Sequence, residues 1–129
     1  MILLDTHIWI WLADGSDRIA QGHAEKIEAH EGTGIGISVI SCWEVGKLVE
    51  YNRLKLACTV EEWMNGALAL PGIQLVELSP RIAIESTQLP GAFHKDPADQ
   101  IIVATARVLG LELLTVDEKI LRYPHVQAE

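Results

Sequence analysis

Four short apolar runs, separated by stretches long enough to hold helices, constrain what this chain can fold into. The runs are Met1–Leu4, Ile35–Ser38, Ile73–Leu78 and Leu111–Val116. Apolar runs of this length without polar alternation are typical of strands that are buried on both faces, as in a parallel sheet. Parallel strands need crossover connections, which helices usually provide. The sequence therefore predicts an α/β fold with a central parallel sheet of four to five strands and helices on both faces.

The expected helices follow from capping residues and breakers. They span residues 7–12, 20–30, 39–51, 59–70, 79–88, 97–109 and 117–122. Pro97 suits the first turn of a helix and Gly110 suits its end, so the segment 97–109 is the clearest of these. Three crossovers then carry two helices each, and Pro124–Gln127 is the candidate for a fifth strand at an edge of the sheet.

Length and composition favour one domain, residues 1–129, with a packed core. The net charge of −8 argues against a broad basic surface for nucleic acid, but not against a nuclease whose cations neutralise an acidic site. Two cysteines make no disulfide framework, and no signal peptide or membrane span is apparent. We therefore expect a cytoplasmic protein that does not enter a membrane.

Acidic residues follow the predicted strands or begin the helices next to them. Asp5 and Asp117 come after strands, Glu44 lies in the first turns of a helix, and Asp96 and Asp99 open the helix that starts at Pro97. The carboxyl ends of parallel strands share one edge of the sheet, so we expect these acids to converge there. Each acid alone is explained as a helix cap or a dipole partner, and Ser41 with Glu44 has the spacing of a capping box.

Convergence of several carboxylates would require a cation, because buried like charges raise one another's pKa. Oxygen ligands without a Cys or His grouping favour Mg²⁺ or Mn²⁺ over zinc. Metal-assisted hydrolysis of a phosphodiester is the chemistry that such a site supports.

Four motifs in order resemble the PIN domain, and most of all the VapC toxins of bacterial and archaeal toxin–antitoxin pairs. They are Leu3-Leu4-Asp5-Thr6, Ser38-x-x-Ser41-x-x-Glu44, Asp96-Pro97-x-Asp99 before Ile101–Ala106, and Leu114-Thr115-Val116-Asp117. The resemblance covers nearly the whole chain. It implies a three-layer PIN fold and a single-strand-specific endoribonuclease that uses Mg²⁺ or Mn²⁺.

The resemblance also implies roles for individual residues and partners. Asp5, Glu44, Asp99 and Asp117 match the metal-binding and catalytic acids of the family, and Thr6 and Thr115 match hydroxyl positions beside the first and last of them. Asp96 is assigned first to capping and second to metal binding. The implied partners are an RNA substrate, a VapB-like antitoxin that covers the acidic site, and a second copy of the chain in a homodimer.

Several residues near these acids have two interpretations. His94 and Lys95 either contact an RNA phosphate or are ordinary exposed loop residues. Lys47, Arg53 and Lys55 either guide RNA or belong to a solvated face. The four tryptophans are expected in the core, with a partner surface as the alternative; they are Trp9, Trp11, Trp43 and Trp63.

Two rival functions remain open from the sequence. A receiver-like phosphoacceptor domain is also α/β with acids at strand ends and bound Mg²⁺, but only a single Asp follows the first strand here and no Lys follows a late strand. The other rival is a PIN fold that has lost its activity and serves as a binding module. The complete set of acids argues against it.

Overall fold

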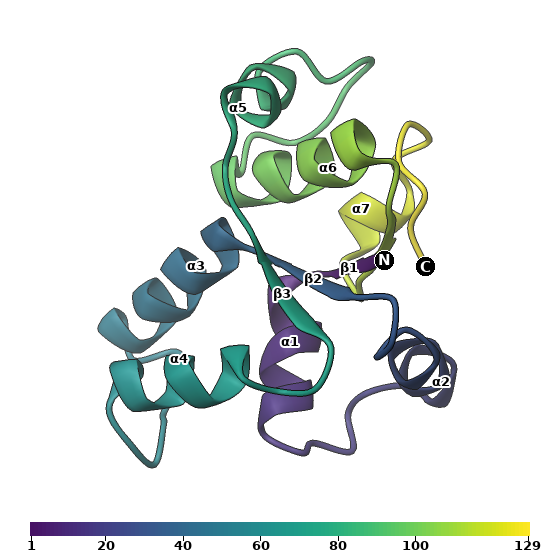
Figure 1. The fold of residues 1–129 in the computed structure, drawn as a ribbon. Coiled ribbons are helices and arrows are strands. Elements are labelled where there is room, and N and C mark those ends of the chain that lie inside the picture. Colours follow the sequence, from purple (N-terminus) through teal and green to yellow (C-terminus); the bar gives the residue numbers. More distant parts are fainter.

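A four-stranded parallel sheet in the order β3-β2-β1-β4 forms the centre of the computed structural model, which describes residues 1–129 (Figure 1). The strands are β1 (Ile2–Leu4), β2 (Ile35–Ser38), β3 (Ile73–Val76) and β4 (Glu112–Leu114). Neighbouring strands pair in parallel, with Leu3 opposite both Gly36 and Leu113. The predicted parallel sheet is confirmed, with four regular strands.

Seven helices connect and cover these strands. They are α1 (Thr6–Ala13), α2 (Gln21–Ala29), α3 (Val39–Glu50), α4 (Val60–Leu68), α5 (Pro80–Ser86), α6 (Pro97–Leu109) and α7 (Glu118–Leu121). Each crossover between strands carries two helices, as the sequence predicts. No helix is both long and apolar enough to cross a membrane.

Successive residues of β1 point to opposite faces of the sheet and divide the core in two. Ile2 and Leu4 pack in a cluster that includes residues of α1, α2, α3 and α4, whereas Leu3 packs with residues of α6 and α7. Figure 1 shows α1 and α4 on one side of the strands and α5 and α6 on the other. All three strand residues are buried, and full burial of such a side chain contributes about 1.5 to 3 kcal/mol. These layers hold the strand ends in place.

The predicted edge strand at Pro124–Gln127 is wrong in its position. The pairing with β4 comes later: the Leu113 N–H donates to the Gln127 carbonyl at 2.9 Å, and Leu113 forms an isolated parallel bridge with Ala128. Tyr123 is buried against the face of α6 and donates its hydroxyl to the Pro90 carbonyl, while Pro124 has no N–H to offer a neighbouring strand. The chain therefore reaches the sheet only at its last residues.

The order of the strands creates a crevice at the carboxyl end of the sheet. The chain proceeds from β1 outward through β2 to β3, and then returns to place β4 on the other side of β1. In open parallel sheets this reversal is where ligands bind, because the connections from two neighbouring strands diverge there. The residues that follow β1 and β4 thus face a common opening.

Candidate metal centre

Asp5 follows β1 and is the most buried of the acids, with 6% of its surface exposed. It caps α1: its Oδ1 accepts a hydrogen bond from the Thr6 N–H at 2.8 Å, and its Oδ2 accepts one from the Thr115 hydroxyl at 2.6 Å. Burial raises the pKa of Asp5, and the bonds from Thr115 and Thr6 oppose that rise. Both carboxylate oxygens are therefore held in a defined orientation.

Glu44 projects from α3 toward Asp5 and does not belong to a capping box. The predicted box from Ser41 is wrong because β2 continues directly into α3, so that Ser38 is the cap and accepts from the Ile40 N–H at 3.2 Å. Ser41 is buried inside the helix, 2.8 Å from the Thr6 hydroxyl, which donates to Glu44 Oε1. The pKa of Glu44 is raised, chiefly by burial and then by Asp5 and Asp96. Thr6 thus orients the second acid.

Asp96 and Asp99 share the start of α6 but do different things. Asp96 is exposed and caps the helix, with its Oδ1 accepting from the Asp99 N–H at 3.1 Å. The side chain of Asp99 is only 14% exposed and lies 3.0 Å from Nε2 of His94. Burial raises the pKa of Asp99 to about 8, and Asp5, Asp96, Asp117 and Glu44 add to the rise.

Asp117 lies two residues beyond a buried threonine at the end of β4. The Thr115 hydroxyl that donates to Asp5 also accepts from the Asp117 N–H at 3.0 Å, so one side chain connects the residues after β1 and β4. Asp117 also accepts from the Lys119 N–H at 2.8 Å, which begins the short helix α7. The first and last acids are therefore joined through Thr115.

The structure brings the four sequence-predicted acids together. Ligand atoms of Asp5, Glu44 and Asp99 lie within 4.8 Å of one another, and so do those of His94, Asp99 and Asp117. The four acids border a cavity of about 430 Å³, which we call the acid cavity. Its lining comprises Asp5, His7, Trp11, Glu44, Leu48, Arg53, Asp96, Asp99, Val116 and Asp117.

The acid cavity has the chemistry of a site for a divalent cation. No lysine or arginine forms an ion pair with any of its carboxylates. Burial, the first cause, and the neighbouring acids raise the pKa values of Asp5, Glu44 and Asp99, and hydrogen bonds from Thr115 and Thr6 offset only part of that rise. Carboxylate oxygens in this number suit Mg²⁺ or Mn²⁺, and the imidazole of His94 adds one nitrogen next to them.

The remaining sequence-predicted residues divide clearly. Thr6 and Thr115 hydrogen-bond to the acids, and His94 lies against Asp99. Lys95 is exposed and is not part of the cavity lining. Sequence reasoning gave His7 less weight than His94 and Lys95. His7 and Trp11 nevertheless stand one helical turn apart on α1, the helix that begins directly after Asp5, and both line the cavity.

The expectation that all four tryptophans belong to the core is wrong for Trp43. Trp9 and Trp63 are buried and Trp11 is partly buried, but Trp43 is 53% exposed. The reason is its position on α3, on the side opposite to Val45, which carries the contact with the core.

Comparison with known proteins decides which family has this arrangement. The family model described as PIN domain matches residues 2–126, nearly the whole chain. The chain belongs to the PIN domain family. The receiver-like alternative is thereby not favoured.

Relatives within the PIN domain family include a curated protein and several solved structures. Ribonuclease VapC22 of Mycobacterium tuberculosis is 30% identical over 124 residues, which are 96% of this chain and 92% of that protein. A toxin-antitoxin complex from Klebsiella pneumoniae contains a chain that is 25% identical, with a TM-score of 0.65 and coverage of 98% of this chain and 95% of that one. A chain of VapBC2 from Rickettsia felis, bound to a promoter DNA fragment, has a TM-score of 0.72 at 18% identity, covers 100% of this chain and 98% of its own length, and shows the same fold.

Proposed function

We propose that this PIN domain is a metal-dependent endoribonuclease and the toxin of a VapBC-type pair. The observation that carries the proposal is the convergence of Asp5, Glu44 and Asp99 without a lysine or arginine partner. The 30% identity to Ribonuclease VapC22 over nearly the whole chain supports RNA as the substrate. In this proposal Asp5, Glu44, Asp99 and Asp117 hold one or two Mg²⁺ or Mn²⁺ ions.

Bound in the acid cavity, a divalent cation would acidify a water for attack on the phosphorus and neutralise charge on the phosphate oxygens. The chain's own residues supply the geometry. Thr115 orients Asp5 and Thr6 orients Glu44, so neither carboxylate has to be ordered when the site fills. Asp99 must release its proton before it can become a ligand, because its pKa is about 8 in the metal-free protein. The imidazole of His94, with Nε2 3.0 Å from Oδ2 of Asp99, lies directly beside this ligand.

The surroundings of the acids support a role in binding RNA, despite the net charge of −8. Arg53 and His7 line the acid cavity, and Arg53 belongs to none of the ion pairs of the molecule. A cation without an internal partner is available to a phosphate. Lys95, which is exposed just before α6, would contact a part of the RNA that lies farther from the acids.

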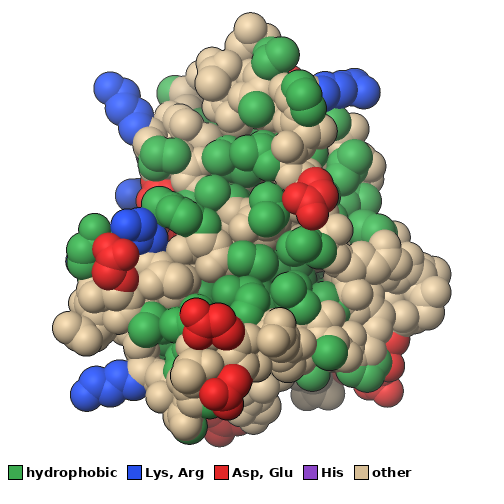
Figure 2. All heavy atoms as spheres, turned by 60° about the vertical axis from the view of Figure 1, so that its left-hand side comes forward, with side chains coloured by type: hydrophobic (Ala, Val, Ile, Leu, Met, Phe, Trp, Pro, Cys, Tyr) green, Lys and Arg blue, Asp and Glu red, His purple; other side chains and the backbone are tan.

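The proposed partners are a VapB-like antitoxin and a second copy of the chain. Structural neighbours that are toxin–antitoxin complexes support the first, and a cationic antitoxin side chain would satisfy the carboxylates that this chain leaves unpaired. For the second, Leu75 on β3 and Ile84 on α5 are 43% and 57% exposed. Figure 2 shows hydrophobic side chains gathered on one face of the molecule, and such patches often mark interfaces. A toxin acting on cellular RNA would work in the cytoplasm.

Cleavage of a panel of single-stranded and structured RNAs tests the function. The purified protein is assayed with Mg²⁺ or Mn²⁺, with EDTA, and as the Asp99→Asn variant. We expect cleavage that disappears with EDTA and falls by at least about 100-fold in Asp99→Asn, because a ligand at the centre of both acid groups is lost. Glu112→Gln removes a carboxylate outside the acid cavity and serves as the matched control that keeps full activity.

Two results would contradict the proposal. Cleavage that survives both EDTA and Asp99→Asn would show that the activity does not come from the acid cavity. Binding of Mn²⁺ without cleavage of any RNA in the panel would favour the alternative of a PIN fold that serves only as a binding module.

A further inference from the structure

Two large aromatic side chains on α3 are exposed next to the acid cavity. Trp43 is 53% exposed and Tyr51, at the end of the helix, is 64% exposed. Lys47 lies between them in sequence, and residues four apart on a helix share one side. The three residues therefore form a continuous strip along one side of α3.

The ammonium group of Lys47 lies near the rings of both Trp43 and Tyr51. Its Nζ lies 5.8 Å from the centre of the Trp43 ring and 5.5 Å from that of Tyr51, which is the range of a cation–π contact. The same ammonium group also pairs with Glu50 at 3.1 Å, but this pair is exposed and readily screened or exchanged. Aromatic faces and a positive charge are thus presented together.

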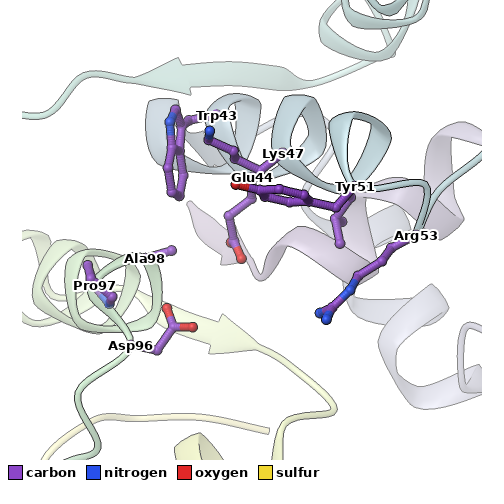
Figure 3. A pocket seen from close by; sticks show the side chains of 9 residues that line it. Trp43, Glu44, Lys47, Tyr51, Arg53, Asp96, Pro97 and Ala98 are labelled. Carbon is purple, nitrogen blue, oxygen red and sulfur yellow. The ribbon is translucent and has the colours of Figure 1, made fainter.

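A cavity of about 180 Å³ separates this strip from the start of α6 (Figure 3). Trp43, Lys47 and Tyr51 line one side, and Pro97 and Ala98 line the other; we call this cavity the aromatic pocket. Its lining also includes four residues of the acid cavity, namely Glu44, Leu48, Arg53 and Asp96. The two cavities therefore adjoin each other, with Glu44 in the lining of both.

Arg53 reaches into this junction because of the turn that ends α3. Asn52 has a φ of 56°, a left-handed conformation that Asn tolerates, and the Arg53 N–H then donates to the Leu48 carbonyl at 2.8 Å. Figure 3 shows the guanidinium group of Arg53 pointing toward the gap between Glu44 and Asp96. Since no carboxylate pairs with it, Arg53 is free to meet an anion at the boundary of the two cavities.

We propose that the aromatic pocket binds one unpaired nucleobase of the RNA strand, next to the phosphate that lies over the acids. The base stacks on Trp43 and Tyr51, and Lys47 and Arg53 contact the phosphates on either side of it. Pockets for drug-sized ligands start at about 300 Å³, so the smaller pocket here suits a single ring system. Stacking on aromatic rings with nearby cations is how proteins hold single-stranded nucleic acid.

This inference rests on the proposed nuclease function, since it assigns a base-binding position to the same site. A protein partner could also cover exposed aromatic residues. The shared lining with the acid cavity and the unpaired Arg53 favour a strand that continues from the pocket to the acids.

The test distinguishes contacts with the bases of the RNA from contacts with its phosphates. Two fluorescent oligomers of equal length are used: single-stranded RNA, and an abasic phosphodiester chain with the same number of phosphates. Their affinities are measured by anisotropy in the Asp99→Asn background, where the RNA is not cut. The variants are Trp43→Ala, Trp43→Phe and Lys47→Gln, and Leu109→Ala is the control for loss of an exposed apolar side chain elsewhere.

Trp43→Ala should weaken binding of the RNA by about 5- to 100-fold and leave the abasic chain unchanged, because base–aromatic stacking is lost. Trp43→Phe should restore most of the affinity, and Leu109→Ala should change neither oligomer. Lys47→Gln should weaken both oligomers and reduce the salt dependence of binding, as expected for a phosphate contact.

Three outcomes would overturn the inference. Equal losses for both oligomers would show that Trp43 does not contact a base, and no loss for either would show that the pocket is not on the path of the strand. A change in oligomeric state with unchanged RNA affinity would assign the strip to a protein interface. The nuclease function is judged separately, by RNA cleavage with the parent protein. Cleavage that EDTA abolishes would support that function in all three cases, and a lack of cleavage would refute it.

Discussion

Carboxylates at the two ends of β4 have different electrostatic surroundings. At the amino end, Glu112 forms an ion pair with Lys26 at 2.7 Å, and the same ammonium group lies 2.5 Å from Glu129. Hydrogen bonding to Lys26 lowers the pKa of Glu129, so its charged form is favoured. At the carboxyl end, Asp117 joins a group of acids without a lysine or arginine partner, and the pKa values of Asp5, Glu44 and Asp99 are raised.

The difference shows which end of the strand is arranged for stability and which for a ligand. Acids that serve the fold are neutralised within the chain, as Glu112 is by Lys26. Acids that remain close together and unneutralised destabilise the folded chain, and they are retained where something outside the chain completes them. The carboxyl end of the sheet is such a place.

The largest expected effect comes from replacing one acid at each end of the sheet by its neutral amide. Asp5→Asn should lower RNA cleavage by about 100-fold or more, because a carboxylate held by Thr6 and Thr115 is replaced by a neutral amide. Asn also caps helices well, so α1 should remain intact. Glu112→Gln should retain the parent rate within error. Cleavage assays with circular dichroism as a control for folding make the comparison; equal losses in both variants would abolish the distinction between the two ends.

A smaller effect is expected on the stability of the metal-free protein. In EDTA at pH 8 to 9, Asp99→Asn should raise the free energy of unfolding by roughly 1 to 3 kcal/mol, since the variant lacks a buried charge. The folded parent retains its proton on Asp99 up to pH about 8, but the unfolded chain loses it near pH 4. The parent's stability should therefore fall as the pH rises through this interval, and the difference between the proteins should vanish below it.

Urea unfolding at several pH values measures this difference. A variant that is less stable than the parent at high pH would show that Asp99 is satisfied in the metal-free fold. That result would contradict the distinction between Asp99, which has no lysine or arginine partner, and Glu112, which is paired with Lys26.

The smallest effect is expected at the amino end of β4. Lys26→Met should lower the melting temperature at pH 7 by only a few degrees, because both ion pairs of Lys26 are partly exposed and salt weakens them. Glu129 has a lowered pKa in the folded state, so its contribution is present above its unfolded pKa and is lost as the pH falls through the folded one. Calorimetry at a series of pH values from 7 downward should thus find the loss largest at pH 7 and smaller as Glu129 becomes protonated. A higher melting temperature in the variant would contradict the stabilising role of Lys26.

Much of the fold and the acid cavity can be predicted from the sequence, because both depend on periodic and local patterns. The buried runs that form β1 and β4 place Asp5 and Asp117 after strands, and Pro97 with Gly110 marks α6 at both ends. A parallel sheet then brings the strand ends together without further information.

The features that the sequence does not predict depend on contacts between distant segments. The position of His94 against Asp99 follows from a loop conformation that no periodic pattern encodes. The exposure of Trp43 depends on which side of α3 faces the core, and the apolar residues on both sides of that helix leave the choice open. The spacing of Trp43, Lys47 and Tyr51 was the available signal, since a lysine in the middle of an aromatic strip indicates an exposed side.

Titration of the purified protein with Mn²⁺ tests the central claim most directly, with calorimetry for affinity and electron paramagnetic resonance for the bound ion. The parent and Glu112→Gln should bind Mn²⁺ equally, and Asp99→Asn should lose most of the affinity. Binding in the parent should release protons at pH 7, because Asp99 is protonated in the metal-free protein. Mn²⁺ binding that is unchanged in Asp99→Asn, or lost in Glu112→Gln, would contradict the assignment of the metal to the carboxyl end of the sheet.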